Sequence, residues 1–153
     1  STLARRLVEE QPAALLSLDA LAFSEDAERR PLSDSVSEAL EFVCLHESWV
    51  VEGCYSDIVE PVLAHADRLI FLNPGVESCV RHCKARPWEP EKFESREAQD
   101  KHLSNLIAWV EQYENRTDEY GLRSHRALFD GFAGDKVEYT DPFRYGDLQG
   151  SEK

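Results

Sequence analysis

The sequence contains no methionine and few basic residues. Its 153 residues include 17 lysines and arginines against 30 aspartates and glutamates, which gives a net charge of −13. Nucleic acids and anionic membranes are bound through Lys and Arg that neutralise phosphates, so this balance argues against both as main partners. One small phosphorylated ligand is still allowed, because it needs only a local basic cluster.

Long hydrophobic runs are also absent. No apolar stretch approaches the roughly 20 residues that span a membrane, and no secretory signal is visible, so we expect a cytoplasmic protein. Because the chain lacks methionine, we expect Ser1 to be either a processed N-terminus or the edge of a longer protein.

Cysteines are few and are not arranged for zinc. Cys79 and Cys83 lie four residues apart, whereas Cys44 and Cys54 are ten apart and fall on different predicted elements. A zinc site needs four ligands, usually in two close pairs. We therefore expect Cys79 and Cys83 to be small hydrophobic residues on the buried side of a helix.

Apolar residues make up 42% of the chain, enough for the core of one domain over residues 1–153. Short apolar segments at 14–18, 49–51, 69–72 and 136–140 are typical of strands, and periodic helical segments lie between them. This alternation predicts an α/β fold, a parallel sheet with helices on both faces.

Local patterns refine the predicted helices. Ser35, with Glu38 three residues later, has the spacing of a capping box and predicts a helix start, and Ser95 is expected to start a long helix. Pro61 is expected in the first turn of the helix after the second strand, where its missing N–H costs nothing. The histidines, among them His125, have no metal-ligand spacing and are expected at the surface.

Polar residues follow the predicted strands where they end. Asp19, Glu52-Gly53 and Asn73 all stand at such ends. In parallel sheets ligands bind beyond the carboxyl ends of the strands, so this edge is the expected binding site. No Ser-His-Asp set or G-x-S-x-G motif indicates a hydrolase.

Three downstream segments, together with the opening STLARRL, resemble small P-loop kinases. These segments are Ser17-Leu18-Asp19, Trp49 to Tyr55, and Asp67 to Leu72, and the order of elements agrees over nearly the whole chain. The resemblance is to kinases of the shikimate kinase and adenylate kinase type and to bacterial topology-modulation-type proteins. STLARRL is similar to the residues after the Gly-Lys of a P-loop, although an ordinary helix start with a Ser or Thr cap has the same pattern.

The glycines and lysine of the P-loop are not in this sequence, and neither is the strand that precedes them. The resemblance implies a parallel sheet of order 2-3-1-4-5 whose central strand, number one, would lie before Ser1. The four visible strands would then form two separate pairs, and the strands at 49–51 and 69–72 would not bond to each other.

The resemblance also implies roles for residues near the phosphates. Ser1 would bind Mg²⁺ and, with Thr2, the phosphates of ATP. Arg86, and more weakly Arg81, would stabilise the transferred phosphoryl group from a lid over residues 86–94, which we expect to be a mobile loop. The alternative for these arginines is a solvated helix face with local ion pairs.

On the acceptor side, Asp19 would orient the acceptor hydroxyl or take its proton, although an aspartate there is equally consistent with a turn or helix cap. Gly53 would let the acceptor approach the backbone, and Tyr55 would cover it, unless that ring belongs to the core. One arginine would bind an anionic group of the acceptor, with Arg126 preferred; the candidates are Arg116, Arg123 and Arg126.

The leading hypothesis is therefore phosphoryl transfer from ATP, with Mg²⁺, to a small hydroxylated metabolite or nucleotide. The alternative is a non-catalytic relative that keeps the scaffold and binds a nucleotide or a protein partner.

Overall fold

The computed structural model describes residues 2–141, and in them helices alternate with four strands. The elements are α1 (Thr2–Glu10), β1 (Ala14–Ser17), α2 (Asp19–Ala22), α3 (Leu32–Leu45), β2 (Trp49–Glu52), α4 (Ser56–Leu63), β3 (Arg68–Leu72), α5 (Val76–Lys84), α6 (Arg96–Glu111), α7 (Leu122–Gly131) and β4 (Asp135–Tyr139). The structure is thus mixed α/β, as the alternation predicted.

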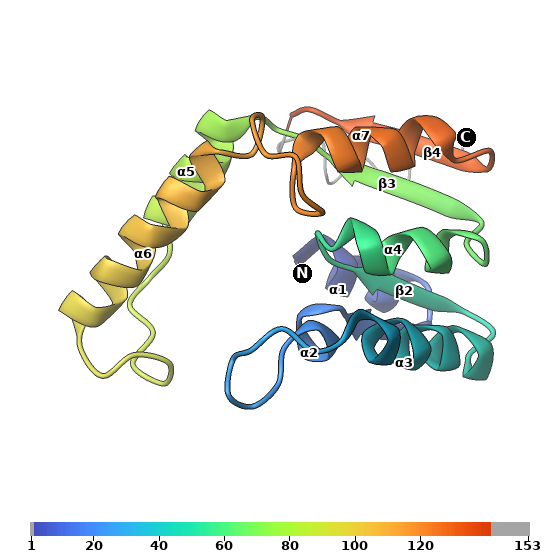
Figure 1. The fold of residues 1–153 in the computed structure, drawn as a ribbon, viewed down its shortest axis with the longest axis horizontal. Helices are drawn as coiled ribbons and strands as arrows, with labels where there is room; N and C mark the ends of the chain where they lie inside the picture. Colours follow the sequence, from blue (N-terminus) through green and yellow to red (C-terminus); the bar gives the residue numbers. More distant parts are fainter. Residues whose placement is uncertain (1, 142–153) are drawn as a thin grey trace.

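The strands form two parallel pairs rather than one sheet. β1 pairs with β2, with Leu15 opposite Val50, and β3 pairs with β4, with Ile70 opposite Val137. Among the described residues no hydrogen-bond ladder joins β2 to β3. This confirms the expected separation of the two pairs. All four strands run in the same direction, with β2 and β3 as the inner strands (Figure 1).

One edge of β2 points away from its partner. The carbonyl oxygens of Ser48 and Glu52 accept hydrogen bonds from N–H groups at the two ends of β1. Because successive residues of a strand direct their backbone groups to opposite sides, Trp49 and Val51 direct theirs to the other edge.

The inner edge of β3 is placed in the same way. The N–H of Asn73 donates to the Tyr139 carbonyl of β4, so the backbone groups of Ile70 and Leu72, at odd spacings from Asn73, face away from β4. Two inner strands therefore present backbone donors and acceptors at edges that carry no strand neighbour in the described part of the chain.

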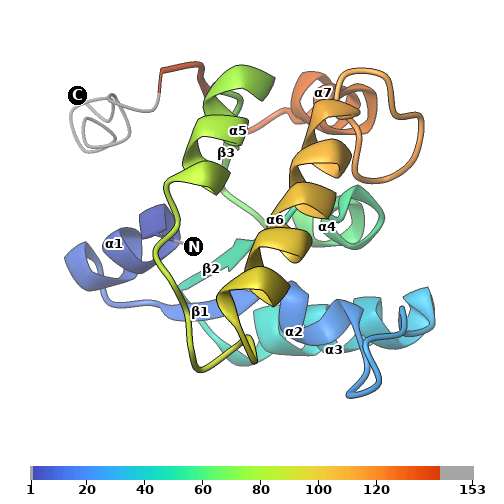
Figure 2. The ribbon, with the colours of Figure 1, turned by 90° about the vertical axis from the view of Figure 1, so that its left-hand side faces the viewer.

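Helices lie on opposite faces of the two pairs. α1 packs on one face of β1 and β2, while α3, α4 and α7 lie on the other side (Figure 2). The core gathers between α3, α4 and the start of α2; its fully buried large apolar side chains are Leu18 and Ile58. By contrast, every residue of β1 and β2 is at least partly exposed.

α5 and α6 pack against each other and form a hairpin that stands beyond the carboxyl ends of the strands (Figures 1 and 2). Its tip is the segment from Arg86 to Glu94, which is irregular and has no buried residue. The predicted loop is therefore present, and it lies beyond the carboxyl edge of the strands, separated from the strand ends (Figure 1). As predicted, Ser95 starts α6: it caps the helix, since its Oγ accepts a hydrogen bond from the Ala98 N–H at 3.0 Å.

Two local predictions were wrong. Ser35 is not a cap: α3 begins at Leu32, after Pro31, and the buried Ser35 hydroxyl instead donates to the Leu21 carbonyl at 2.8 Å. Pro61 is the sixth residue of α4 rather than part of its first turn. The helix begins earlier because Ser56 anchors it, donating its Oγ hydrogen to the Glu119 carbonyl at 2.8 Å.

Candidate functional site at the carboxyl edge

The structure places Asp19 and Tyr55 in direct contact. Asp19 begins α2, separated from the end of β1 by one residue, and its side chain is exposed. The Tyr55 hydroxyl, from the turn before α4, donates to Asp19 Oδ1 at 2.5 Å. Burial, together with this hydrogen bond and the charge of Asp19, raises the pKa of Tyr55 well above its usual range. The tyrosine therefore stays protonated and keeps one carboxylate oxygen of Asp19 occupied.

Tyr55 is a core residue except for its hydroxyl. It is 4% exposed and belongs to the cluster around Leu18 and Ile58, so the structure supports a core role for this ring. The ring of Phe23, which is 41% exposed, meets it edge-on with centroids 6.1 Å apart.

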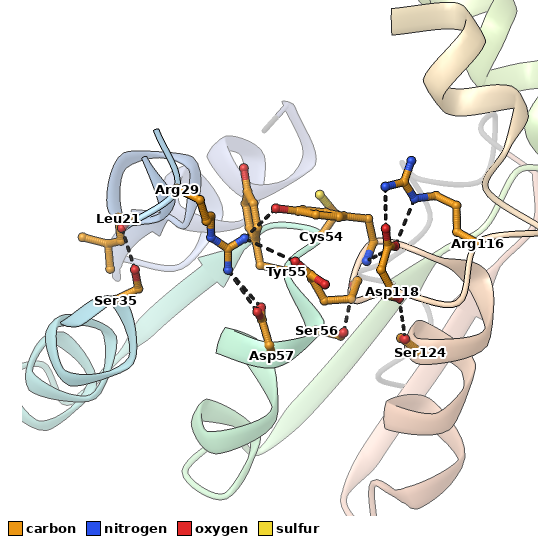
Figure 3. Close-up of polar contacts among 12 residues, drawn as sticks. Leu21, Arg29, Ser35, Cys54, Tyr55, Ser56, Asp57, Arg116, Asp118 and Ser124 are labelled. Atoms are coloured by element: carbon orange, nitrogen blue, oxygen red, sulfur yellow. Dashed lines mark hydrogen bonds and ion pairs between the residues drawn. The ribbon is translucent and has the colours of Figure 1, made fainter. Parts of the chain in front are cut away.

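Arg29 lies beside Tyr55 and makes contacts that connect three segments of the chain (Figure 3). Its Nη2 donates to both carboxylate oxygens of Asp57, at 3.0 and 3.2 Å, and its Nη1 donates to the Tyr120 hydroxyl at 2.5 Å. Glu119 Oε1 lies 3.8 Å from Nη1. The guanidinium also stacks over the Tyr55 ring, 4.9 Å from its centroid, an arrangement that favours a planar cation.

The groups around Arg29 favour its charged form. Burial works to lower the pKa of Arg29, but the charge of Asp57 and the Tyr120 hydroxyl outweigh it, and the pKa lies above its usual value. The turn that carries Arg29 closes by an antiparallel bridge between Phe23 and Arg29, with Ala27 at a φ of +59°. The Arg29 Nε is buried and makes no hydrogen bond.

Gly53 and Cys54 connect β2 to this site. A Cβ on Gly53, whose φ is +155°, would lie 2.8 Å from the Cβ of Leu18, so the packing of Leu18 already accounts for a glycine here. The predicted contact of Gly53 with a substrate stays a prediction. Burial, with a smaller contribution from the charge of Asp19, raises the pKa of the Cys54 thiol to about 11.

Arg116 lies on the same side of the molecule as Arg29, in the segment after α6. It donates to Asp118 from Nε at 3.0 Å and from Nη2 at 2.5 Å, and it stacks over Trp109 at 4.8 Å. The Trp109 and Tyr120 rings are 5.6 Å apart, edge-on. This stack connects the hairpin helix α6 to the Arg29 cluster.

Arg126, the preferred anion ligand, is engaged elsewhere. Both of its terminal nitrogens donate to Glu138 of β4, at 2.8 and 2.6 Å, and Asn73 Nδ2 donates to the same carboxylate at 3.1 Å. It therefore ties α7 to the ends of β3 and β4. Arg123, the third candidate, is exposed.

His125 is not the surface residue that the sequence predicted. It is half-buried, with Nε2 2.7 Å from the carbonyl oxygen of Cys54 and Nδ1 2.7 Å from the Tyr113 hydroxyl. A carbonyl can only accept, so Nε2 carries a proton. The ring thereby links α7 to the turn before α4.

The lid arginines lie apart from Asp19 in the fold. Arg81, exposed on α5, donates to Ser78 Oγ at 3.1 Å. Arg86 is exposed at the start of the tip, where it lines a small cavity with Glu89, Phe93 and Gln99. Gln99 closes the tip by donating to the Pro87 carbonyl and accepting from the Glu89 N–H, both at 2.9 Å.

Thr2 is the exposed first residue of α1, and that end of α1 lies at the carboxyl edge of the strands (Figure 1). Ser1, the predicted Mg²⁺ ligand, lies outside the described residues.

Within residues 2–141, no group of three His, Cys, Asp or Glu side chains is placed to hold a metal ion, and all four cysteines are free. The same part of the chain has no helix that is both long enough and apolar enough to cross a membrane. Comparisons with family models, with curated proteins and with solved structures found no match to this chain.

Sequence reasoning named Asp19 and Tyr55, which the structure brings into contact, but it did not name Arg29, Asp57 or Tyr120. Arg29 is one of two adjacent arginines in an acidic segment, which was the available signal. Its partners lie 28 and 91 residues away, and no local spacing reveals contacts of that length.

Proposed function

We propose that this chain forms part of a P-loop-type kinase that transfers a phosphoryl group from ATP to a small hydroxylated acceptor. The observation that carries the proposal is the arrangement of the strands. Two parallel pairs run in one direction, and their inner strands β2 and β3 are not bonded to each other, as expected for a sheet of order 2-3-1-4-5 without its central strand.

The open backbone edges of β2 and β3 support the same fold. Native proteins usually pair or cover an open strand edge, and two-stranded sheets are marginal by themselves. A parallel strand between them, supplied by a segment outside residues 2–141, would pair Val51 on one side and Ile70 on the other. It would also cover the partly exposed residues of β1 and β2.

The described residues fit a phosphate at one point. The first turn of α1 lies at the carboxyl edge. The N–H groups of a first turn have no partner within their own helix, so a helix N-terminus favours anions. Thr2 would lie beside such a phosphate, and Ser1 would hold Mg²⁺. Bound MgATP would supply the phosphoryl group and the charge that polarises it.

At the acceptor side the chain supplies Asp19. Tyr55 occupies its Oδ1, so Oδ2 is left to accept a hydrogen bond from an acceptor hydroxyl. The α5–α6 hairpin stands over this edge, where closure would exclude water and bring Arg86 toward the phosphates (Figure 2).

Phosphoryl transfer from MgATP to a panel of hydroxyl compounds tests the proposal. In an active protein Asp19→Asn should lower kcat by roughly 100-fold or more, since general-base positioning contributes on that order. Arg86→Ala should lower kcat more than it raises the KM of the acceptor, because its charge acts in the transition state. Lys84→Ala, an exposed neighbour on α5, is the matched control.

An unchanged kcat in Arg86→Ala would remove that residue from the mechanism. If Asp19→Asn keeps the wild-type kcat, Asp19 takes no part in the reaction. If MgATP binds but no transfer occurs, the non-catalytic nucleotide-binding alternative is favoured.

A further inference from the structure

The arginines near the acceptor edge already have anionic partners inside the protein. Arg29 is held by Asp57 and stacked on Tyr55. Arg30, the next residue, donates to both oxygens of Glu38, at 3.1 and 2.6 Å, and to the Leu21 carbonyl at 3.2 Å. A phosphate or carboxylate on the acceptor would have to displace these ion pairs to find a guanidinium.

The same is true on the side toward α6 and α7. Arg116 is paired with Asp118, and Arg126 is paired with Glu138 through two hydrogen bonds. Bidentate arginine–carboxylate pairs are strong and geometrically specific, so their guanidinium groups are poorly available to a second anion. The structure thus offers no ready counterpart for an anionic acceptor among these four arginines.

Arg29 is further restricted by geometry. Its Nε is buried, Nη1 points to Tyr120, and Nη2 is used twice by Asp57. The side chain is about three-quarters covered, with 26% of it exposed. Its flat face rests on the Tyr55 ring, which leaves no free pair of N–H groups for a phosphate.

The turn that carries Arg29 has charge of the opposite sign. The turn between Phe23 and Arg29 carries Glu25, Asp26 and Glu28, all exposed, and its base contacts the Tyr55 ring through Phe23. A dianionic phosphate placed here would be repelled by these carboxylates. The exposed Phe23 ring instead offers an apolar surface to an uncharged ring or a carbon chain.

We infer that the acceptor is a hydroxyl compound without a phosphate or carboxylate group, and that Arg29 is a positioning residue rather than an anion ligand. This inference rests on the proposed function, because it assumes that Asp19 faces the acceptor. It replaces the expectation that Arg116 or Arg126 binds an anionic group of the acceptor. Arg29 acts through Tyr55, whose hydroxyl orients Asp19.

Matched acceptor pairs test the inference: adenosine against AMP, and glucose against glucose 6-phosphate, each with MgATP. We expect kcat/KM to be at least tenfold higher for the uncharged member of the pair that reacts. A preference for the phosphorylated member would overturn the inference.

A binding experiment decides the same question without catalysis. Asp57→Asn removes the charge that holds Arg29, so it should raise the affinity for AMP, measured by calorimetry, at least fivefold over the wild type. Asp100→Asn, an exposed change on α6, should leave that affinity unchanged. The inference is contradicted if the wild type binds AMP as tightly as Asp57→Asn does and Arg29→Lys binds AMP at least fivefold more weakly than the wild type.

These outcomes separate the inference from the proposed function. If MgATP fails to bind, the proposed function fails, while the comparison of AMP affinity in Asp57→Asn still decides the role of Arg29. If MgATP binds and AMP is the better acceptor, only the inference fails.

Discussion

Cys54 and Tyr55 are adjacent, and Asp19 affects the titration of both. Burial and the Asp19 charge raise the pKa of each, to about 11 for the Cys54 thiol. A thiol has an ordinary pKa of 9.0, so in the unfolded chain it ionises about two pH units earlier. The contribution of Cys54 to stability is therefore complete below pH 9 and is lost as the pH rises through about 11.

This linkage predicts the alkaline stability of the protein. Two pKa units correspond to about 2.7 kcal/mol. Between pH 9 and 11 the free energy of unfolding should therefore fall by about 2–3 kcal/mol more in the wild type than in Cys54→Ala. Denaturant titrations at several pH values measure this fall in the free energy of unfolding. Cys44→Ala, an exposed cysteine on α3, should follow the wild-type curve, and a Cys54→Ala curve parallel to the wild type would disprove the assignment.

At the residue scale the sequence predicted positions better than contacts. Asp19 could be placed because a strand end is visible in the hydrophobic pattern. The role of Ser35 could not, since its hydroxyl is used by a carbonyl fourteen residues away and the spacing to Glu38 mimics a cap. Glu38 itself pairs with Arg30. Tertiary hydrogen bonds of this kind produce no periodic pattern in the sequence.

Among the elements, strand and helix periods were sufficient to predict all four strands and the two helices that flank the 86–94 loop, but not that these helices pack against each other as a hairpin. The ends were less certain: Pro61 lies deeper in α4 than predicted, because Ser56 and its bond to Glu119 extend the helix toward its N-terminus. The hairpin tip has no buried residue, so its order depends on a few hydrogen bonds rather than on packing.

Gln99 is the residue on which that tip depends. Its side chain bonds to Pro87 and Glu89 across the loop. Gln99→Ala removes two hydrogen bonds of about 1 kcal/mol each, so amide exchange over residues 87–93 should rise by roughly 10-fold or more. The amides of β1 should be unaffected. Asn105→Ala, an exposed change on the same helix, is the control, and unchanged exchange at the tip in Gln99→Ala would show that other contacts hold it.

In the whole molecule, the resemblance to P-loop kinases predicted two separate strand pairs. The structure has these two pairs, and the central strand between them is a prediction. If a fifth strand joins them, the amides of Val51 and Ile70 should exchange as slowly as those of Val50 and Phe71, which face β1 and β4. Nuclear magnetic resonance of the complete protein can compare the four amides. A direct hydrogen bond between Val51 and Ile70 would exclude a strand between them.

Binding of MgATP is the central claim that the strand arrangement, the α1 terminus and the hairpin share. A ligand that binds only the folded protein at 100 times its Kd stabilises it by about 2.7 kcal/mol, which for a chain of this length raises Tm by roughly 5–10 °C. The most direct measurement is the Tm of the complete protein titrated with MgATP. The account predicts a rise of this size that saturates with concentration, and a Tm that does not change at millimolar MgATP would contradict it.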